Sequence, residues 1–182
     1  IGLNKTGLNQ LIKEDTKINP INPYGKTKAS IESFLIDVYK SDPKNWRIAN
    51  LRYFNPVGAH PCGLIGENNS QEATNLFPNI LKVAKGYRRN ISIYGKDWPS
   101  KDGTCIRDYI HVMDLAEGHI RALNYLFSKE NELINLNLGT GIGKSVLEVI
   151  ETFEKTNNLK IPYIFEDRRE GDRAEVVANI EL

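Results

Sequence analysis

A helix with one apolar face, followed closely by a strand, is the feature that most constrains the fold of this chain. The apolar residues have i, i+3, i+4 and i+7 spacing and are Ile31, Phe34, Leu35 and Val38, a pattern that predicts one buried helix face. Asp42-Pro43 ends this helix, and Trp46 to Phe54 then reads as a strand that Asn55-Pro56 breaks. A helix that leads directly into a strand favours an α/β fold with a doubly wound parallel sheet.

The middle of the chain predicts shorter elements. Gly58 to Gln71 is polar and contains several Gly and Asn residues, so we expect a loop there. A second helix ends at Gly86, and its apolar stripe consists of Phe77, Ile80, Leu81 and Ala84. Ile91 to Tyr94 predicts a short strand, and a strand around Arg107 precedes a helix that begins at Val112.

The start of the first helix places a phenol and an ammonium on one helix face. Pro20 and Pro23 keep the approach extended, and Asn22 is a suitable N-cap before a proline at the first helical position. Tyr24 and Lys28 are four residues apart, so their side chains address the same small volume. A nearby cation favours the phenolate form of a tyrosine, which can accept a proton from a substrate hydroxyl. From these residues alone, an unreactive surface pair remains the alternative.

Charge and cysteine content argue against several other classes of protein. The formal charge is +1 with acidic and basic residues interspersed, so composition gives no reason to expect nucleic acid or an anionic membrane as a partner. The cysteines and histidines have no metal-ligand or disulfide-framework spacing, and we assign no metal; they are Cys62, Cys105, His60, His111 and His119. With no apolar run long enough to span a bilayer, we expect a cytoplasmic protein.

Three long motifs follow one another along the chain. They are Asn22-Pro-Tyr-Gly-Lys-Thr-Lys28, Leu51-Arg-Tyr-Phe-Asn-Pro-Val-Gly-Ala-His-Pro61 and Asp102-Gly-Thr-Cys-Ile-Arg-Asp-Tyr-Ile-His-Val-Met-Asp-Leu115. Together they resemble the UDP-glucose 4-epimerase family of extended short-chain dehydrogenases, from about Glu14 to about Asn179. The resemblance implies that residues 1–57 are the C-terminal part of a Rossmann-like NAD-binding domain with its catalytic helix. Residues 58–182 would be mainly a smaller α/β UDP-sugar-binding domain, with segments near 104–128 returning to the first.

The same resemblance makes us expect a fragment. The Gly-x-x-Gly-x-x-Gly turn with which the family cradles the NAD pyrophosphate does not occur in this sequence, and the first residue is Ile. Residues 1–12 do not match the strand and the Ser or Thr that complete the family's catalytic trio. We therefore expect an incomplete doubly wound sheet, in which the strand at Trp46 to Phe54 has an unpaired edge and the apolar stripe that begins at Ile31 loses partners. Such a chain would be marginally folded and inactive alone, and a homodimer when the protein is intact.

The resemblance also implies roles for individual residues. Tyr24 and Lys28 would be catalytic and, together with Tyr53 and Phe54, would contact NAD. The implied contacts to the UDP-sugar are Asn55, Asn75, Leu76, Ser92, Tyr94, Arg107, Tyr109, Arg169, Asp172 and Val176. Val176 stands where the family limits the space around the second carbon of the sugar, and because valine is small we expect UDP-N-acetylhexosamines to be accepted as well.

Taken locally, several of these residues have structural explanations. Asn55-Pro56 is a common turn, Tyr94 suits a core, Arg107 suits an exposed ion pair, and Arg168 to Asp172 suits a solvated run of charges. The loop at Gly139 to Gly143 looks like a phosphate loop. Its glycine pattern is incomplete, and it leads into the capping box formed by Ser145 and Glu148, so we interpret it as structural.

The function that the resemblance implies is NAD-dependent interconversion of UDP-galactose and UDP-glucose through a 4-keto sugar. Tyr24 would take the proton of the 4-hydroxyl while hydride leaves the fourth carbon, and Lys28 would hold the nicotinamide ribose. One alternative is a non-catalytic UDP-sugar-binding remnant. Another is a nucleotide-sugar dehydratase or decarboxylase, although the motifs at Tyr53 to His60 and at Arg168 to Asp172 favour the epimerase.

Overall fold

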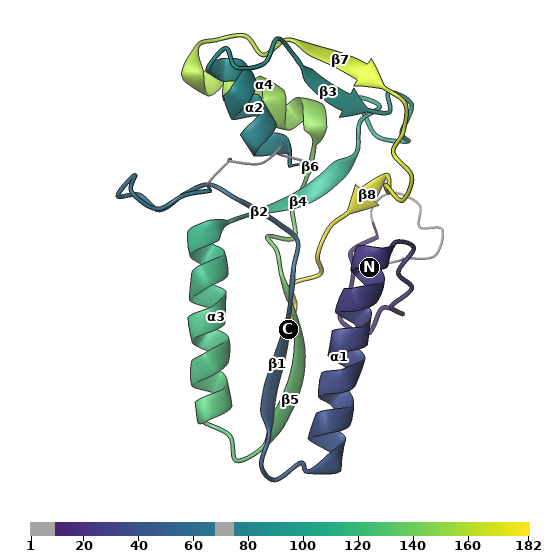
Figure 1. Cartoon of the computed structure of the whole chain (residues 1–182), viewed down its shortest axis with the longest axis vertical. Coiled ribbons are helices and arrows are strands. Elements are labelled where there is room, and N and C mark those ends of the chain that lie inside the picture. Colours follow the sequence, from purple (N-terminus) through teal and green to yellow (C-terminus); the bar gives the residue numbers. More distant parts are fainter. Residues whose placement is uncertain (1–9, 68–74) are drawn as a thin grey trace.

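The computed structural model describes residues 10–67 and 75–182 and has an α/β fold (Figure 1). Its helices are α1 (Pro23–Ser41), α2 (Leu76–Ala84), α3 (Val112–Phe127) and α4 (Val146–Asn157). Its strands are β1 (Arg47–Tyr53), β2 (Asn55–Val57), β3 (Ile91–Tyr94), β4 (Ile106–His111), β5 (Glu132–Leu138), β6 (Gly143–Ser145), β7 (Tyr163–Glu166) and β8 (Glu175–Val176). The expectations for residues 1–9, and for the end of the predicted loop at 68–71, lie outside the described residues.

A parallel pair of strands forms the first part of the fold. β1 pairs with β5 along its whole length, from Arg47 opposite Glu132 to Tyr53 opposite Leu138. Figure 1 shows α3 on one side of this pair and α1 on the other, the arrangement expected of a doubly wound sheet. The predicted α/β class is therefore confirmed, and the predicted strand at Trp46 to Phe54 is β1. Strand β5 was not predicted from the sequence.

Helix α1 begins as predicted, but its apolar stripe is not buried. The Asn22 side chain caps the helix by accepting a hydrogen bond of 2.7 Å from the Gly25 amide. Ile31 and Phe34, however, are 53% and 65% exposed, and α1 contains no buried residue. Leu35 and Val38 are half-buried, so the stripe is covered only in part. The described sheet beneath the helix consists of β1 and β5 alone, which agrees with the expectation that the stripe loses partners in an incomplete sheet.

A second apolar core lies between α2, α4 and the parallel pair formed by β3 and β7. Its buried residues are Ile80, Val83, Ile91, Ile93, Ile150 and Ile161. Helix α2 contributes Val83 to this core, whereas Leu81 of the predicted stripe is 41% exposed. Gly86 follows the helix with φ of +74°, a left-handed conformation that suits glycine and ends α2 where predicted.

Strand β4 joins the two parts. It pairs with β2, β6 and β8, and its Asp108 side chain is fully buried. The Asp108 carboxylate accepts hydrogen bonds from the amides of Thr140, Gly141 and Ala178 at 2.8, 3.0 and 3.2 Å. The amides that made residues 139–143 look like a phosphate loop thus bind an internal carboxylate, which supports the structural interpretation of this loop. The capping box of Ser145 and Glu148 is present at the start of α4.

Candidate functional site

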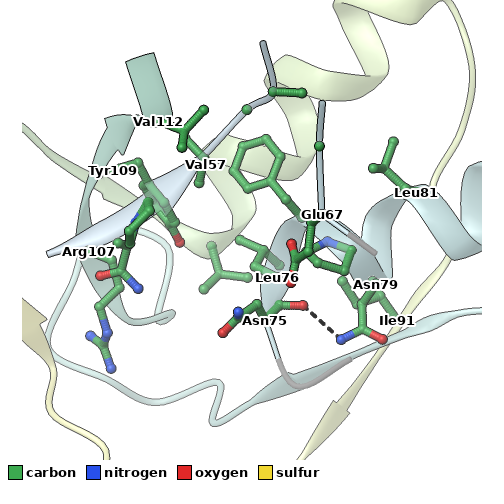
Figure 2. Close-up of a pocket in the computed structure, with 18 of the residues that line it drawn as sticks. Val57, Glu67, Asn75, Leu76, Asn79, Leu81, Ile91, Arg107, Tyr109 and Val112 are labelled. Carbon is green, nitrogen blue, oxygen red and sulfur yellow. Dashed lines mark hydrogen bonds between the residues drawn. The ribbon is translucent and has the colours of Figure 1, made fainter. Parts of the chain in front are cut away.

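A cavity of about 1100 Å³ lies where β2, β3, β4 and α2 meet. All of the residues predicted to contact a UDP-sugar line it except Val176, and they are Asn55, Asn75, Leu76, Ser92, Tyr94, Arg107, Tyr109, Arg169 and Asp172. Figure 2 shows Arg107 and Tyr109 of β4 across the cavity from Asn75 and Leu76. Residues that are far apart in the sequence therefore converge on one hollow.

The start of α2 forms one wall of the cavity. Asn75 occupies the N-cap position, but its side chain makes no capping hydrogen bond. Its backbone carbonyl instead accepts a hydrogen bond of 2.8 Å from the side-chain Nδ2 of Asn79 (Figure 2). The side-chain amide of Asn75 is therefore not committed to the helix start, and an amide can both donate to and accept from a ligand.

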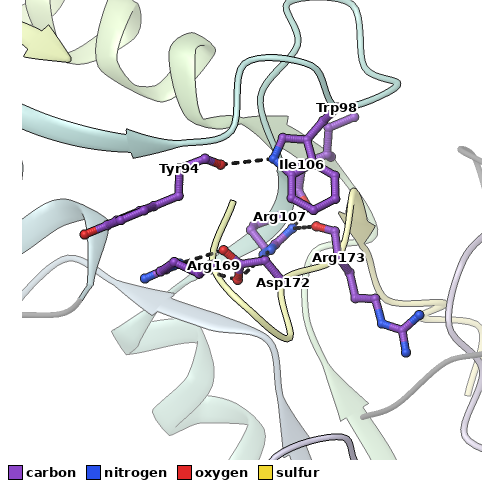
Figure 3. A network of polar contacts seen from close by, with 7 residues as sticks. All are labelled: Tyr94, Trp98, Ile106, Arg107, Arg169, Asp172 and Arg173. Atoms are coloured by element: carbon purple, nitrogen blue, oxygen red, sulfur yellow. Dashed lines mark hydrogen bonds and ion pairs between the residues drawn. The ribbon is translucent and has the colours of Figure 1, made fainter. Parts of the chain in front are cut away.

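The opposite end of the cavity carries a cluster of charged residues (Figure 3). Asp172 lies between two arginines: Arg169 Nε donates to Asp172 Oδ2 at 2.9 Å, and Arg107 Nη2 is 3.6 Å from Asp172 Oδ1. The Arg107 guanidinium also donates to the carbonyls of Ile106 and Arg173, both at 2.8 Å. Two guanidinium groups and one carboxylate leave the cluster with a net positive charge, which suits phosphate oxygens.

An aromatic ring extends this cluster. The Arg169 guanidinium lies 4.4 Å from the centre of the Tyr94 ring, a cation–π contact. Tyr94 ends β3 and is 37% exposed, so the core explanation of this residue is wrong. The explanation of Arg107 as an exposed ion pair is also wrong, because its side chain retains only 15% exposure.

Tyr109 presents a neutral phenol to the cavity. Burial raises its pKa to about 12, with Arg107 opposing that shift. Its ring meets Phe77 edge-on, with 5.9 Å between the ring centres.

Phe77 and Cys105 also line the cavity, and neither was predicted as a site residue. Burial raises the pKa of the Cys105 thiol, and the adjacent Arg107 and Asp172 act on it in opposite directions. Of these two residues, only Phe77 could have been predicted to line the site, because it directly follows the predicted contact Leu76.

Tyr24 and Lys28 lie outside this cavity, at the start of α1. The Lys28 ammonium is 5.3 Å from the centre of the Tyr24 ring, so the two side chains are adjacent as predicted, and Tyr24 is 72% exposed. The segment just before them, Ile21 and Asn22, lies near Gly171, which is in the turn between Arg169 and Asp172. A Cβ atom at Gly171 would lie 3.7 Å from Ile21 Cδ1 and 3.9 Å from Asn22 Nδ2. The start of α1 therefore packs against the turn between Arg169 and Asp172.

The other predicted cofactor residues lie at the end of β1. The Tyr53 hydroxyl is 2.6 Å from His119 Nε2, and His119 Nδ1 is 2.8 Å from the Leu115 carbonyl. A carbonyl only accepts, so Nδ1 donates to Leu115, and Nε2 shares a hydrogen bond with the Tyr53 hydroxyl. The Phe54 amide donates to the Leu138 carbonyl at 3.0 Å. Neither Tyr53 nor Phe54 lines the cavity.

Val176 also lies outside the cavity. It belongs to β8, where it pairs directly with Arg107 of β4, a member of the charged cluster. Within residues 10–67 and 75–182, no three His, Cys, Asp or Glu side chains are grouped as a metal site would require. No helix in the same part of the chain combines the length and apolar character needed to cross a membrane.

Parallel strand pairs flanked by helices define a Rossmann-like α/β protein, in which a cavity with two arginines lies beside a helix that carries Tyr24 and Lys28. The comparisons narrow this class. The model of the NAD dependent epimerase/dehydratase family matches residues 5–139, and the chain belongs to that family.

Individual relatives cover nearly the whole chain. It is 50% identical over 165 residues to UDP-glucose 4-epimerase of Drosophila melanogaster and 48% identical over 168 residues to that of Bacillus subtilis. These matches cover 90% and 92% of this chain but only 47% and 49% of the relatives. A crystal structure of UDP-glucose-4-epimerase from Stenotrophomonas maltophila with bound NAD and formylated UDP-arabinopyranose superposes with a TM-score of 0.90 at 42% identity, over 97% of this chain and 52% of that one. The chain thus spans about half the length of each of these three relatives.

Proposed function

We propose that this chain supplies the UDP-sugar site and the Tyr-Lys helix of a UDP-glucose 4-epimerase, which interconverts UDP-galactose and UDP-glucose with NAD. The observation that carries the proposal is the single cavity that gathers nearly all of the predicted UDP-sugar contacts. The similarity to two UDP-glucose 4-epimerases and to a structure with bound NAD and a UDP-sugar derivative supports it.

The charged cluster has the chemistry needed to hold a nucleoside diphosphate. Arg169 and Arg107 would bind the diphosphate oxygens, since guanidinium groups form paired hydrogen bonds with phosphate. The Asp172 carboxylate would accept a hydrogen bond from a ribose hydroxyl. Tyr94, an exposed aromatic at the end of β3, would stack on the uracil. These contacts retain the nucleotide while the sugar is free to turn.

The residues predicted to hold NAD are compatible with a cofactor next to the sugar. Tyr24 and Lys28 are adjacent, open to solvent, and carried on a helix whose start packs against the Gly171 turn. Tyr53 is the last residue of the neighbouring strand β1 and Phe54 follows it, at the edge where doubly wound sheets bind nucleotides. NAD bound there supplies a group that accepts and returns hydride. Tyr24 would take the proton of the sugar 4-hydroxyl, and the Lys28 ammonium beside it would hold the nicotinamide ribose.

The proposal extends to the organisation of the protein. Residues 1–57 would belong to the NAD-binding domain together with the returning segments near 104–128, and the rest of 58–182 mainly to the UDP-sugar domain. Because β5 pairs with β1, we add Glu132–Leu138 to the NAD-binding part. The intact protein would be a cytoplasmic homodimer, and both Cys62 and Cys105 are free thiols, as a reducing compartment favours.

Turnover in a full-length context tests the proposal. A chimera in which this chain replaces the matching segment of the Bacillus subtilis enzyme should convert UDP-galactose to UDP-glucose. Tyr24→Phe in that chimera should lower kcat by roughly 10²–10⁴-fold, the usual contribution of a general base, with little change in UDP binding. A chimera that folds and binds NAD but does not turn over would contradict the proposal, and full activity of the Phe variant would reject the role of Tyr24.

A non-catalytic UDP-sugar-binding protein is the second candidate. One observation favours it: the charged cluster lies wholly within the cavity, whereas Tyr24 and Lys28 lie outside it. This candidate predicts UDP binding by the chain together with a chimera that is inactive with or without the Tyr24 hydroxyl. The two candidates therefore differ in the turnover of the unmodified chimera.

A further inference from the structure

We propose that Arg168 and Trp98 are positioning residues of the nucleotide site. Arg168 is stacked on Trp98 and bonded to Asp97, and by this attachment it holds the neighbouring Arg169 over Tyr94. This inference rests on the proposed UDP-sugar function, since it concerns how the arginine of the diphosphate cluster is kept in place.

Trp98 is fixed against the end of β3 by several contacts. Its indole Nε1 donates to the Tyr94 carbonyl at 3.0 Å (Figure 3), and its backbone amide donates to the Gly103 carbonyl at 3.0 Å. At Gly95, which has φ of +85°, a Cβ atom would lie 2.3 Å from Trp98 Nε1 and 2.9 Å from Arg168 Cγ. The indole and the arginine therefore pack directly on the backbone that carries Tyr94.

Arg168 is held to this loop by three contacts. Its guanidinium carbon lies 4.0 Å from the centre of the Trp98 ring. Its Nε donates to Asp97 Oδ1 at 2.9 Å, and its Nη2 donates to the Asp97 backbone carbonyl at 2.7 Å. The two charged side chains are 42% and 71% exposed, and an exposed ion pair by itself contributes little. The ring stacking and the bond to the backbone carbonyl therefore carry most of the attachment.

The two consecutive arginines have different partners. Arg168 does not line the cavity and binds the loop behind Tyr94. Arg169 lines the cavity, stacks on the Tyr94 ring and donates to Asp172. The same stretch is tied to β3 by the Gly95 amide, which donates to the Glu166 carbonyl at 2.8 Å. Because the two residues share a peptide bond, fixing the first limits where the second can reach.

Calorimetric titration of UDP into the 182-residue chain tests this role. Arg168→Ala should weaken UDP binding by roughly 5- to 20-fold, as expected when one hydrogen bond to a charged group is displaced. Trp98→Ala should have a similar effect, while Asp97→Asn should have a smaller one because the backbone carbonyl and the ring remain. Arg121→Ala, which removes an exposed arginine of α3 paired with Glu117, is the matched control and should bind UDP like the unmodified chain.

A double-mutant cycle separates positioning from an independent contribution. If Arg168 acts through Arg169, the Arg168→Ala/Arg169→Ala double variant should bind UDP no more weakly than Arg169→Ala alone. Losses that multiply in the double variant would overturn the inference. So would an Arg168→Ala variant that binds like the unmodified chain, although the proposed function would then stand. A folded chain that does not bind UDP at all would overturn the proposed function together with the inference.

The same substitutions in the Bacillus subtilis chimera give a second readout that does not depend on how well the chain folds alone. Arg168→Ala should raise KM for UDP-galactose and leave kcat nearly unchanged, because the sugar is still presented to Tyr24 once bound. A purely structural role would lower the amount of folded chimera and leave KM unchanged. That outcome would also overturn the inference.

Discussion

Arg52 and Glu32 form a bidentate ion pair that joins β1 to α1, the helix that carries Tyr24 and Lys28. Arg52 Nε donates to Glu32 Oε2 at 3.0 Å, and the Arg52 Nη2 group donates to the other carboxylate oxygen. The third guanidinium nitrogen, Nη1, donates to the Glu14 carbonyl at 2.6 Å. Both side chains of the pair are largely shielded from solvent, although α1 contains no buried residue. A polar contact therefore helps to fix the rotation of α1 on the sheet.

Glu32→Gln should destabilise the fold more than most surface substitutions. It leaves the Arg52 charge partly buried without its partner, which should lower the free energy of unfolding by roughly 2–4 kcal/mol, somewhat below the value for a fully buried pair. Urea unfolding followed by circular dichroism measures this loss.

The exposed pair of Arg121 and Glu117 provides a control of the same chemistry. Arg121→Ala should lower the free energy of unfolding by no more than about 1 kcal/mol, because an exposed ion pair is well solvated in both states. If the Glu32 and Arg121 variants lose equal amounts of unfolding free energy, the pair of Arg52 and Glu32 stabilises the fold no more than an exposed ion pair does.

Much of the cavity was predictable because its residues lie in continuous motifs. Arg107 and Tyr109 belong to one predicted strand, and Arg169 and Asp172 belong to one short turn. Local signals also worked where the chain determines its own conformation, as at the Asn22 cap and the Ser145 capping box. In these places the partners are only a few residues apart.

Most of the features that were not predicted depend on residues that are far apart in the sequence. Arg52 and Glu32 are separated by 20 residues, and Arg168 and Asp97 by 71 residues, so no local pattern pairs them. Helical spacing predicted that one face of α1 is apolar, but burial of that face requires a sheet wide enough to cover it. Strand β5 is different, because Asn135 and Asn137 alternate with its leucines in the period of two that is typical of a strand, and this local signal was overlooked.

Gly139→Ala should destabilise the chain, since the turn encloses a buried carboxylate. A Cβ atom at Gly139 would lie 2.5 Å from Asp108 Oδ2 and 2.8 Å from Ala178 Cβ. Asp108 and Ala178 are both fully buried and cannot easily move, so the expected cost is about 1–3 kcal/mol, typical of overpacking. Thermal unfolding measures it, and Gly66→Ala, where the nearest atom is 3.5 Å away, is the matched control. Equal melting temperatures for the two variants would refute the argument.

Val176→Tyr tests the expectation that N-acetylated sugars are accepted. Val176 of β8 pairs with Arg107 of β4, so a larger side chain at position 176 should reduce the space beside the charged cluster. In the chimera, we expect the unmodified chain to turn over UDP-N-acetylglucosamine and the Tyr variant to lose that turnover by roughly 10-fold or more, as when a bulky group is excluded from a site. Conversion of UDP-galactose by the same variant is the control. Loss of both activities, or of neither, would count against a role in sugar selection.

Asp102 should make the stability of the chain depend on pH in the acid range. Burial alone would raise the pKa of its carboxyl, but hydrogen bonds from Ser145, Thr104 and Ser100 outweigh burial and hold the pKa below its usual value. A carboxyl with a lowered pKa in the folded state stabilises the fold above the unfolded pKa of about 4, and this contribution is lost as the pH falls through the folded pKa.

Urea unfolding of the unmodified chain and of Asp102→Asn at several pH values measures this contribution. The variant should be less stable at neutral pH, because a neutral amide cannot accept all of the hydrogen bonds that the carboxylate receives from Ser145 and Thr104. The difference between the two proteins should shrink below about pH 4, where Asp102 of the unmodified chain takes up a proton and loses the same bonds. A difference that stays constant from neutral to acid pH would mean that packing, and not ionisation, accounts for the effect of Asp102.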